Sequence, residues 1–132
     1  MRKRYLKSIS MNKKTVVLGA SPNPSRYAYI ASELLSEYGH EVVPVGIRKG
    51  EVSGKEIMDG GRFPVIKDVD TVTLYVAAAR QPSLFDYILS LNPKRVIFNP
   101  GTENPILYKI LDNAGIPWME ACTLVMLRTG QY

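Results

Sequence analysis

The chain has 132 residues, of which 45% are hydrophobic and 22% are charged, and these values are typical of a single ordinary globular domain. The net charge of +5 comes from the first 14 residues, which hold six basic and no acidic side chains, while the remainder holds 11 basic and 12 acidic ones. The charge therefore does not indicate a nucleic-acid-binding face. No apolar run approaches the roughly 20 residues of a membrane span.

Residues 1–13 are expected to form a basic, flexible N-terminal arm that precedes a domain over residues 14–132. The arm lacks the apolar core of a secretory signal, and Met11 would itself make a natural start. An electrostatic function for the arm remains open. One cysteine, Cys122, and one histidine, His40, allow neither an internal disulfide nor a zinc site. This composition fits a reducing compartment and predicts a cytoplasmic protein.

Short β-branched runs predict the strands, and most are almost continuously apolar, as expected of parallel strands that are covered on both faces. Pro44 cannot donate a ladder hydrogen bond, so it should lie near a strand end or at an edge. In chain order, the expected strands are residues 15–18, 41–45, 64–66, 71–76 and 95–98, with a last short one around Trp118.

Three helices are expected between these strands. Apolar residues recur at helical spacing over 27–38, before Gly39, and over 84–91, after Pro82. A third helix should begin at Asn104 and Pro105 and end at Gly115. The segment 49–62 holds four glycines and no periodicity, so we expect a surface connection with at most a short helical turn.

Strands that alternate with helices predict an α/β fold: a Rossmann-like, doubly wound, mostly parallel sheet of five or six strands in a single domain. Ligands of such sheets bind at the carboxyl ends of the strands, near the point where the strand order reverses. Those ends carry "GASPNPS", "VGIRKG", "VAAARQP" and "NPGTEN". We expect these four loops to form one rim.

The first loop favours an anion. Gly19 permits a tight turn, Ser21 offers a hydroxyl group, and the following helix presents free N–H groups beside the charge of Arg26. A phosphate site follows, although a glycine turn before a helix is also common without any ligand.

The second loop distinguishes between nucleotides. An NAD site usually has an acidic residue after the second strand, where it binds the ribose hydroxyls. Here the chain has Arg48 and Lys49 instead, which favours a ribose that carries a phosphate, as in NADP or coenzyme A. Two solvated charges on a turn are the alternative.

The stretches "VVLGASPNPSRYAY", "VVPVGIRKGEVSGK", "DTVTLYVAAARQPS" and "VIFNPGTENPILYKILDNAGI" together resemble the small single-domain CoA-binding proteins, relatives of the CoA-binding domain of the succinyl-CoA synthetase alpha subunit. The similarity runs from Lys14 to Tyr132. It implies a Rossmann-type fold in which the CoA adenosine and phosphates lie across the first two loops and the backbone near Val76 and Ala77 contributes to the groove. Ile47 stands where the family often has proline, and "AAA" replaces a turn that contains more proline.

The loops and the resemblance together give the following expected cofactor-binding residues: Gly19, Ala20, Ser21, Pro22, Arg26, Val45, Gly46, Ile47, Arg48, Lys49, Val76, Ala77, Arg80, Gln81, Asn99 and Gly101. Tyr75 alternates within an apolar strand and is expected in the core. No catalytic or metal-binding residue is assigned. His40 should lie at the edge opposite the ligand loops. Cys122 is expected to be a buried small residue, with a thiol role left open.

Two functions remain open at this point. The first is a module that binds CoA or an acyl-CoA, as a sensor or as a subunit that acts with a partner, and either a protein partner or a homo-oligomer is compatible with it. The second is an NADP-dependent oxidoreductase or another nucleotide-binding enzyme. The lack of a substrate domain and of an acid–base pair favours the first.

Overall fold

The computed structural model of the chain describes residues 12–132. Most of the expected basic arm, residues 1–11, lies outside the described residues. Asn12 and Lys13, which were assigned to that arm, contact the domain: the Asn12 side-chain oxygen accepts a hydrogen bond from the Glu41 N–H at 2.9 Å, and the Lys13 N–H donates to His40 Nδ1 at 2.9 Å. Among residues 12–132, no helix is long and apolar enough to cross a membrane.

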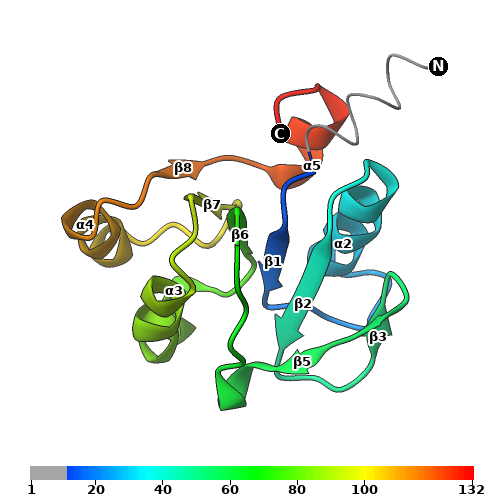
Figure 1. The fold of residues 1–132 in the computed structure, drawn as a ribbon, viewed down its shortest axis with the longest axis horizontal. Coiled ribbons are helices and arrows are strands. Elements are labelled where there is room, and N and C mark those ends of the chain that lie inside the picture. Colours follow the sequence, from blue (N-terminus) through cyan, green and yellow to red (C-terminus); the bar gives the residue numbers. More distant parts are fainter. Residues whose placement is uncertain (1–11) are drawn as a thin grey trace.

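The main sheet has six strands in the order β5-β2-β1-β6-β7-β8, and every neighbouring pair is parallel. The predicted Rossmann-like fold is therefore confirmed. The chain moves outward from β1 to β2 and later returns to the other side of β1 with β6, so the strand order reverses between β1 and β6 (Figure 1). The strands are β1 (Thr15–Leu18), β2 (Val42–Gly46), β5 (Met58–Asp59), β6 (Thr71–Leu74), β7 (Arg95–Phe98) and β8 (Trp118–Glu120).

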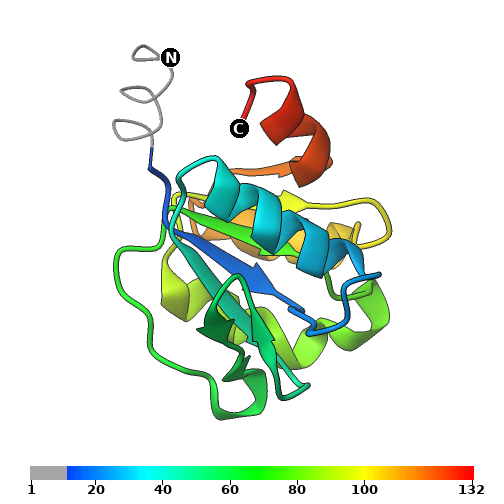
Figure 2. The same ribbon diagram turned by 90° about the vertical axis from the view of Figure 1, so that its right-hand side faces the viewer.

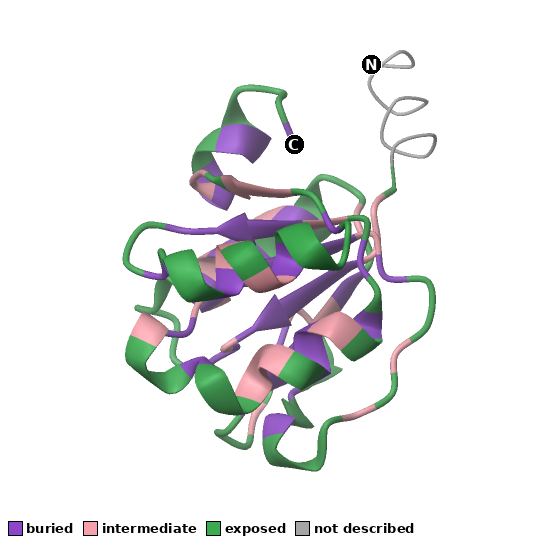
Figure 3. Cartoon of the chain, turned by 90° about the vertical axis from the view of Figure 1, so that its left-hand side faces the viewer, coloured by how far each residue is buried: buried purple, intermediate pink, exposed green. Residues whose placement is uncertain are grey.

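Helices cover both faces of this sheet, as Figures 1 and 2 show. One face packs on α3 (Phe85–Leu91) and α4 (Pro105–Asn113), and the other packs on α2 (Tyr27–Glu37) and α5 (Thr123–Arg128). Because successive strand residues point to opposite faces, Val16 and Leu18 join the first core and Val17 joins the second. Figure 3 shows the resulting buried strands behind helices whose outer surfaces are exposed.

One expected strand is absent, and the outer strand of the sheet forms where none was expected. Residues 64–66 form no strand, and Val65 is 87% exposed. The outer strand is instead β5, which pairs with the last two residues of β2. It lies within the segment that was expected to be a plain surface connection. That segment also contains a hairpin of β3 (Glu51–Val52) and β4 (Lys55–Glu56), and the short 3-10 helix η1 (Gly60–Arg62).

The position of Pro44 in the sheet can be compared with the expectation. Pro44 lies inside β2, but β5 pairs with this strand only from Val45 onward, so no strand pairs with β2 at Pro44 on its outer side. This agrees with the edge position that its missing N–H requires.

Helix α5, near the end of the chain, was not anticipated. Two short 3-10 helices, η2 (Ala78–Arg80) and η3 (Pro82–Leu84), lead from β6 into α3.

Candidate functional site

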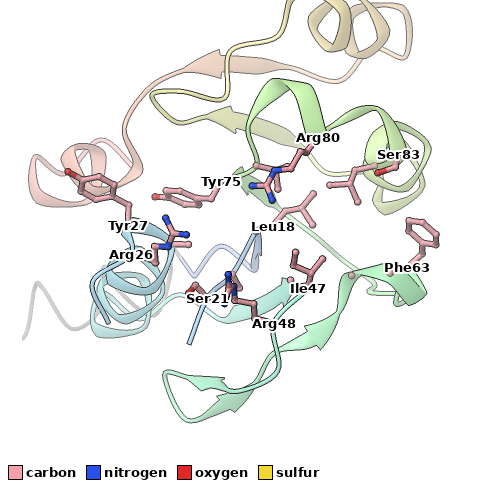
Figure 4. Close-up of a pocket in the computed structure, with 18 of the residues that line it drawn as sticks. Leu18, Ser21, Arg26, Tyr27, Ile47, Arg48, Phe63, Tyr75, Arg80 and Ser83 are labelled. Carbon is pink, nitrogen blue, oxygen red and sulfur yellow. The ribbon is translucent and has the colours of Figure 1, made fainter. Parts of the chain in front are cut away.

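A cleft of about 630 Å³ opens at the carboxyl ends of β1, β2 and β6 (Figure 4). This is the place where the strand order reverses, and it is where doubly wound sheets bind their ligands. A smaller cavity of about 210 Å³ adjoins it and shares Ser21, Arg26 and Arg48 with it. The loops after three separate strands therefore meet at one site.

Two glycines allow these loops to approach each other closely. Gly19 has a φ of +99°, and a Cβ atom built there would lie 2.7 Å from the Tyr75 carbonyl oxygen. A Cβ atom on Gly46 would collide with the carbonyl oxygen of Ala20. Any side chain at either position would push the loops after β1, β2 and β6 apart.

The amino end of α2 faces the cleft. The first N–H groups of a helix have no partner within it, and Arg26, the residue before α2, makes no side-chain cap. The preceding turn is held by its own side chains: Ser21 Oγ accepts from the Asn23 N–H at 3.1 Å, and Asn23 Oδ1 accepts from the Ser25 N–H at 3.0 Å. The uncapped helix start therefore presents donors and a positive dipole end to a ligand.

Three arginines line the cleft, and each comes from a different segment. Arg26 precedes α2, Arg48 follows β2 and Arg80 ends η2, and Figure 4 shows all three around the cleft. No acidic side chain lines it. Within residues 12–132, ion pairs form only between Lys14 and Glu41 and between Arg62 and Asp59, so none of these three guanidinium groups is neutralised by a carboxylate. The cleft is suited to an anion with several charges.

The structure brings most of the expected site residues together. The cleft is lined by Gly19, Ala20, Ser21, Arg26, Gly46, Ile47, Arg48, Val76 and Arg80, and Pro22 lines the smaller cavity. Neither cavity is lined by Val45, Lys49, Ala77, Gln81, Asn99 or Gly101.

Gln81 and Asn99 do not line the cleft but form hydrogen bonds that hold the loops beside it. Both side chains are buried, and their amide groups are used within the protein. Gln81 Nε2 donates to the carbonyl oxygens of Val76 and Thr102, at 2.8 and 2.7 Å, and Gln81 Oε1 accepts from Asn104. Asn99 Nδ2 donates to Thr73 Oγ1 and to the Leu74 carbonyl oxygen, and Asn99 Oδ1 accepts from the Thr123 N–H. These bonds fix the loops that follow β6 and β7.

Sequence reasoning missed one wall of the cleft. Gly60, Gly61 and Phe63 line it from the segment after β5, which has no periodicity to identify it. Tyr75, which was expected in the core, is only partly buried and also lines the cleft. Burial raises the pKa of its phenol well above the ordinary value, so Tyr75 stays neutral. The other unanticipated lining residues are Leu18, Ser25, Tyr27, Ala28, Ser83 and Leu84.

His40 lies away from this site, whereas Cys122 lies close enough to the cleft-lining Tyr75 to raise its pKa beyond the effect of burial. His40 precedes β2 at the opposite end of the sheet, as predicted, and burial together with the charges of Lys13 and Arg95 lowers its pKa. Cys122 is half-buried rather than buried, which corrects the expectation, and it occupies the N-cap position of α5. It lines neither cavity. In the described part of the chain, no group of three or more His, Cys, Asp or Glu side chains is placed to hold a metal ion.

Comparison with other proteins connects this site to known relatives. The model of a family described as a CoA binding domain matches residues 13–128. An uncharacterised protein of known crystal structure is 56% identical, with a TM-score of 0.88, over 92% of this chain and 98% of that one. A Thermus thermophilus protein is 25% identical, with a TM-score of 0.82, over 100% and 99% of the two chains. A conserved hypothetical protein of Pyrococcus furiosus is 27% identical, with a TM-score of 0.76, over 86% of this chain and 97% of that one. No curated protein matches the chain.

Proposed function

Because this chain belongs to the family of CoA binding domains, we propose that it binds coenzyme A or an acyl-CoA in the cleft at the carboxyl ends of β1, β2 and β6. The observation that carries the proposal is the convergence of Arg26, Arg48 and Arg80 on a cleft without a lining carboxylate. CoA has two bridged phosphates and a third on its ribose. Three guanidinium groups match three phosphate groups.

The two cavities allow these phosphates to be separated. In the proposed pose, the pyrophosphate of CoA lies against the uncapped start of α2, between Arg26 and Arg80. The ribose 3′-phosphate reaches the smaller cavity, where Arg48 lies close to Pro22 and Asn23. The volume of the main cleft falls within the range of about 300–1,000 Å³ that is usual for small-molecule sites.

The chain then acts as a binding module, alone, as a homo-oligomer or with a protein partner. No acid–base pair is evident among the lining residues, which include no His, Asp, Glu, Cys or Lys. The competing proposal of an NADP-dependent enzyme shares the phosphate contacts, so ligand preference must distinguish the two.

Calorimetric titration of the protein with CoA, acetyl-CoA, dephospho-CoA, NADP and NAD tests the proposal. We expect CoA to bind more tightly than dephospho-CoA, and both CoA and acetyl-CoA to bind more tightly than NADP or NAD. A preference for NADP over CoA would favour the oxidoreductase. If the protein binds none of the five ligands, the nucleotide assignment is overturned.

A further inference from the structure

The cleft has an apolar end, remote from the start of α2. Phe63 follows η1, which follows β5, and β5 lies beyond β2 on the side away from β1. Figure 4 shows Phe63 and Ile47 on the side of the cleft opposite Arg26 and Tyr27. Phe63 is 48% exposed and Ile47 is 79% exposed, although both are large apolar residues. The two side chains offer apolar surface that the protein itself does not cover.

Phe63 has an unusual backbone conformation. Its φ and ψ angles are 49° and 60°, in the left-handed region that bulky side chains rarely adopt. The Phe63 N–H donates to the Gly60 carbonyl oxygen at 3.1 Å, which closes the short η1 turn. Residues held in such conformations are often found at ligand sites, where the surrounding structure stabilises them.

Tyr87 of α3 holds this strained turn in place. Its hydroxyl group donates to the Pro64 carbonyl oxygen at 2.6 Å, and its ring lies 5.6 Å from the ring of Phe63 at an interplanar angle of 54°. The Tyr87 side chain is buried, and burial raises its pKa to about 12, so the hydroxyl remains a donor at neutral pH. The Phe63 ring is thus supported from behind and left free towards the cleft.

The two glycines beside Phe63 are not explained by the protein's own packing. Neither Gly60 nor Gly61 has a positive φ. A Cβ atom on Gly60 would approach no atom closer than 3.5 Å, and one on Gly61 would meet only the flexible Asp59 carboxylate, at 3.3 Å. Both residues nevertheless line the cleft. Their missing side chains leave space that the chain does not use.

We propose that Phe63, Ile47 and the Gly60–Gly61 pair form a slot for a flat aromatic ring, with Phe63 as its stacking wall and Tyr87 as a positioning residue behind it. This inference rests on the proposed function, under which the ring is the adenine base of CoA. Stacking on an aromatic face is open to any base, so the slot contributes affinity for a nucleotide ligand while the arginines select its phosphates.

The first test is the affinity for CoA, measured by calorimetry. Phe63→Ala should weaken CoA binding about tenfold, because one base–aromatic stack is lost. Phe63→Trp should bind at least as tightly as the wild type. Gly61→Val fills the slot without removing a contact and should weaken binding to a similar degree. Val65→Ala is the matched control, since Val65 is more exposed than Phe63, lies two residues away and does not line the cleft.

The second test locates the base itself, at saturating ligand. Acrylamide quenching of bound etheno-CoA, whose modified adenine is fluorescent, should be weak in the wild type and in Val65→Ala. It should be strong in Phe63→Ala, and intermediate in Tyr87→Phe, which keeps the ring and loses the hydrogen bond to Pro64. A merely structural role of Tyr87 would alter the melting temperature and leave the shielding of the base unchanged.

The outcomes separate this inference from the proposed function. If the wild type binds CoA while Phe63→Ala and Gly61→Val bind it equally tightly, the slot is wrong and the function stands. If the wild type binds no CoA, both are overturned. Circular dichroism of each variant shows whether a loss of binding reflects a loss of folding. Gly61→Val keeps the proposal falsifiable if Phe63→Ala does not fold.

Discussion

Arg48 and Lys49 are neighbours in the chain and carry the same charge, yet only Arg48 lines the cleft and the smaller cavity beside it. The sequence placed both in the nucleotide site because both stand where an NAD-binding chain has an acid. The pattern of residues after the second strand was sufficient to identify this loop. Which of the two cations faces the cleft depends on the direction of each side chain after β2, and a local pattern does not contain that information.

Separate substitutions should therefore have different effects. We expect Arg48→Ala to reduce the affinity for CoA by about one to two decades, because a hydrogen bond to a charged group contributes roughly 1.5–3 kcal/mol and salt reduces it toward the lower value. Affinity for dephospho-CoA should change little. Lys49→Ala serves as the control and should alter neither affinity by more than about threefold. Titrations at fixed ionic strength check this, and equal weakening towards both ligands would show that Arg48 supplies only general positive charge.

Asn99 was also expected to contact the ligand, and its environment leads to a different prediction. Its amide joins β6, β7 and the start of α5 through three hydrogen bonds in a buried position. Asn99→Ala removes all three bonds and leaves the Thr123 N–H without this acceptor, although Thr73 Oγ1 keeps its bond to Thr123 Oγ1, so the free energy of unfolding should fall by about 2–4 kcal/mol. Urea unfolding measures this change. If the variant is fully stable and has lost CoA binding, then Asn99 contacts the ligand directly.

At the scale of elements, α5 shows why a short helix is not detected by the periodicity of apolar residues. It spans only six residues, and its capping position is occupied by Cys122, which makes no side-chain cap. No helix was expected after Cys122, because the apolar run there is too short for helical periodicity to be distinguished. The helix forms because Thr123, Leu124, Met126 and Leu127 are buried there, and Met126 and Leu127 pack in the core on the α2 side of the sheet.

The capping position reverses an expectation about Cys122. In a buried apolar site, serine would cost stability. Cys122 is instead half-buried at the N-cap, with extended φ and ψ of −105° and 114°, where a serine oxygen can accept an N–H from the first turn. Cys122→Ser should therefore raise the free energy of unfolding by about 0.5–1 kcal/mol. Thermal unfolding of Cys122→Ser and Cys122→Ala checks this, and serine should be the more stable of the two. A less stable serine variant would restore the buried interpretation.

The outer edge of the sheet marks the limit of prediction for the elements. The apolar runs at 15–18 and 95–98 became β1 and β7 with the expected bounds, because these strands are buried on both faces and their composition reflects it. β5 has only two residues, both exposed, and it pairs with β2 through the backbone alone. The more apolar residues 64–66 instead run along the surface, where Tyr87 binds the Pro64 carbonyl oxygen. An apolar composition therefore predicts a strand only where the strand is buried, and an exposed edge strand such as β5 has no such composition.

At the scale of the whole molecule, the cleft occupies the carboxyl edge of the sheet and a separate cluster occupies the amino edge. Tyr132 is buried there, with its hydroxyl group bonded to Thr15 and its ring beside Lys13, His40 and Arg95. Lys13 and Arg95 also donate to the Tyr132 carbonyl oxygen. This cluster joins the residues before β1 to those after α5, and it lies at the end of the sheet remote from the proposed ligand.

His40 makes this amino-edge cluster sensitive to pH. Its Nδ1 accepts a hydrogen bond from the Lys13 N–H and can do so only when neutral. Burial is the main cause that lowers its pKa below the usual 6.5, and Lys13 and Arg95 lower it further, while Asp70 acts in the opposite direction.

Between the folded and unfolded pKa values of His40, the unfolded chain binds more protons than the folded one. Stability from this group is therefore complete above about pH 6.5 and is lost as the pH falls through the folded pKa. We expect the melting temperature of the wild type to decline from pH 7 to pH 5. His40→Asn offers an acceptor at the position of Nδ1 that does not titrate, so its melting temperature should decline less over the same range. Because both proteins share every carboxylate, the difference between them isolates His40. Parallel declines would show that the stability of the amino-edge cluster does not depend on His40. The proposed CoA site lies at the opposite edge, so we expect the same CoA affinity in both proteins at pH 7.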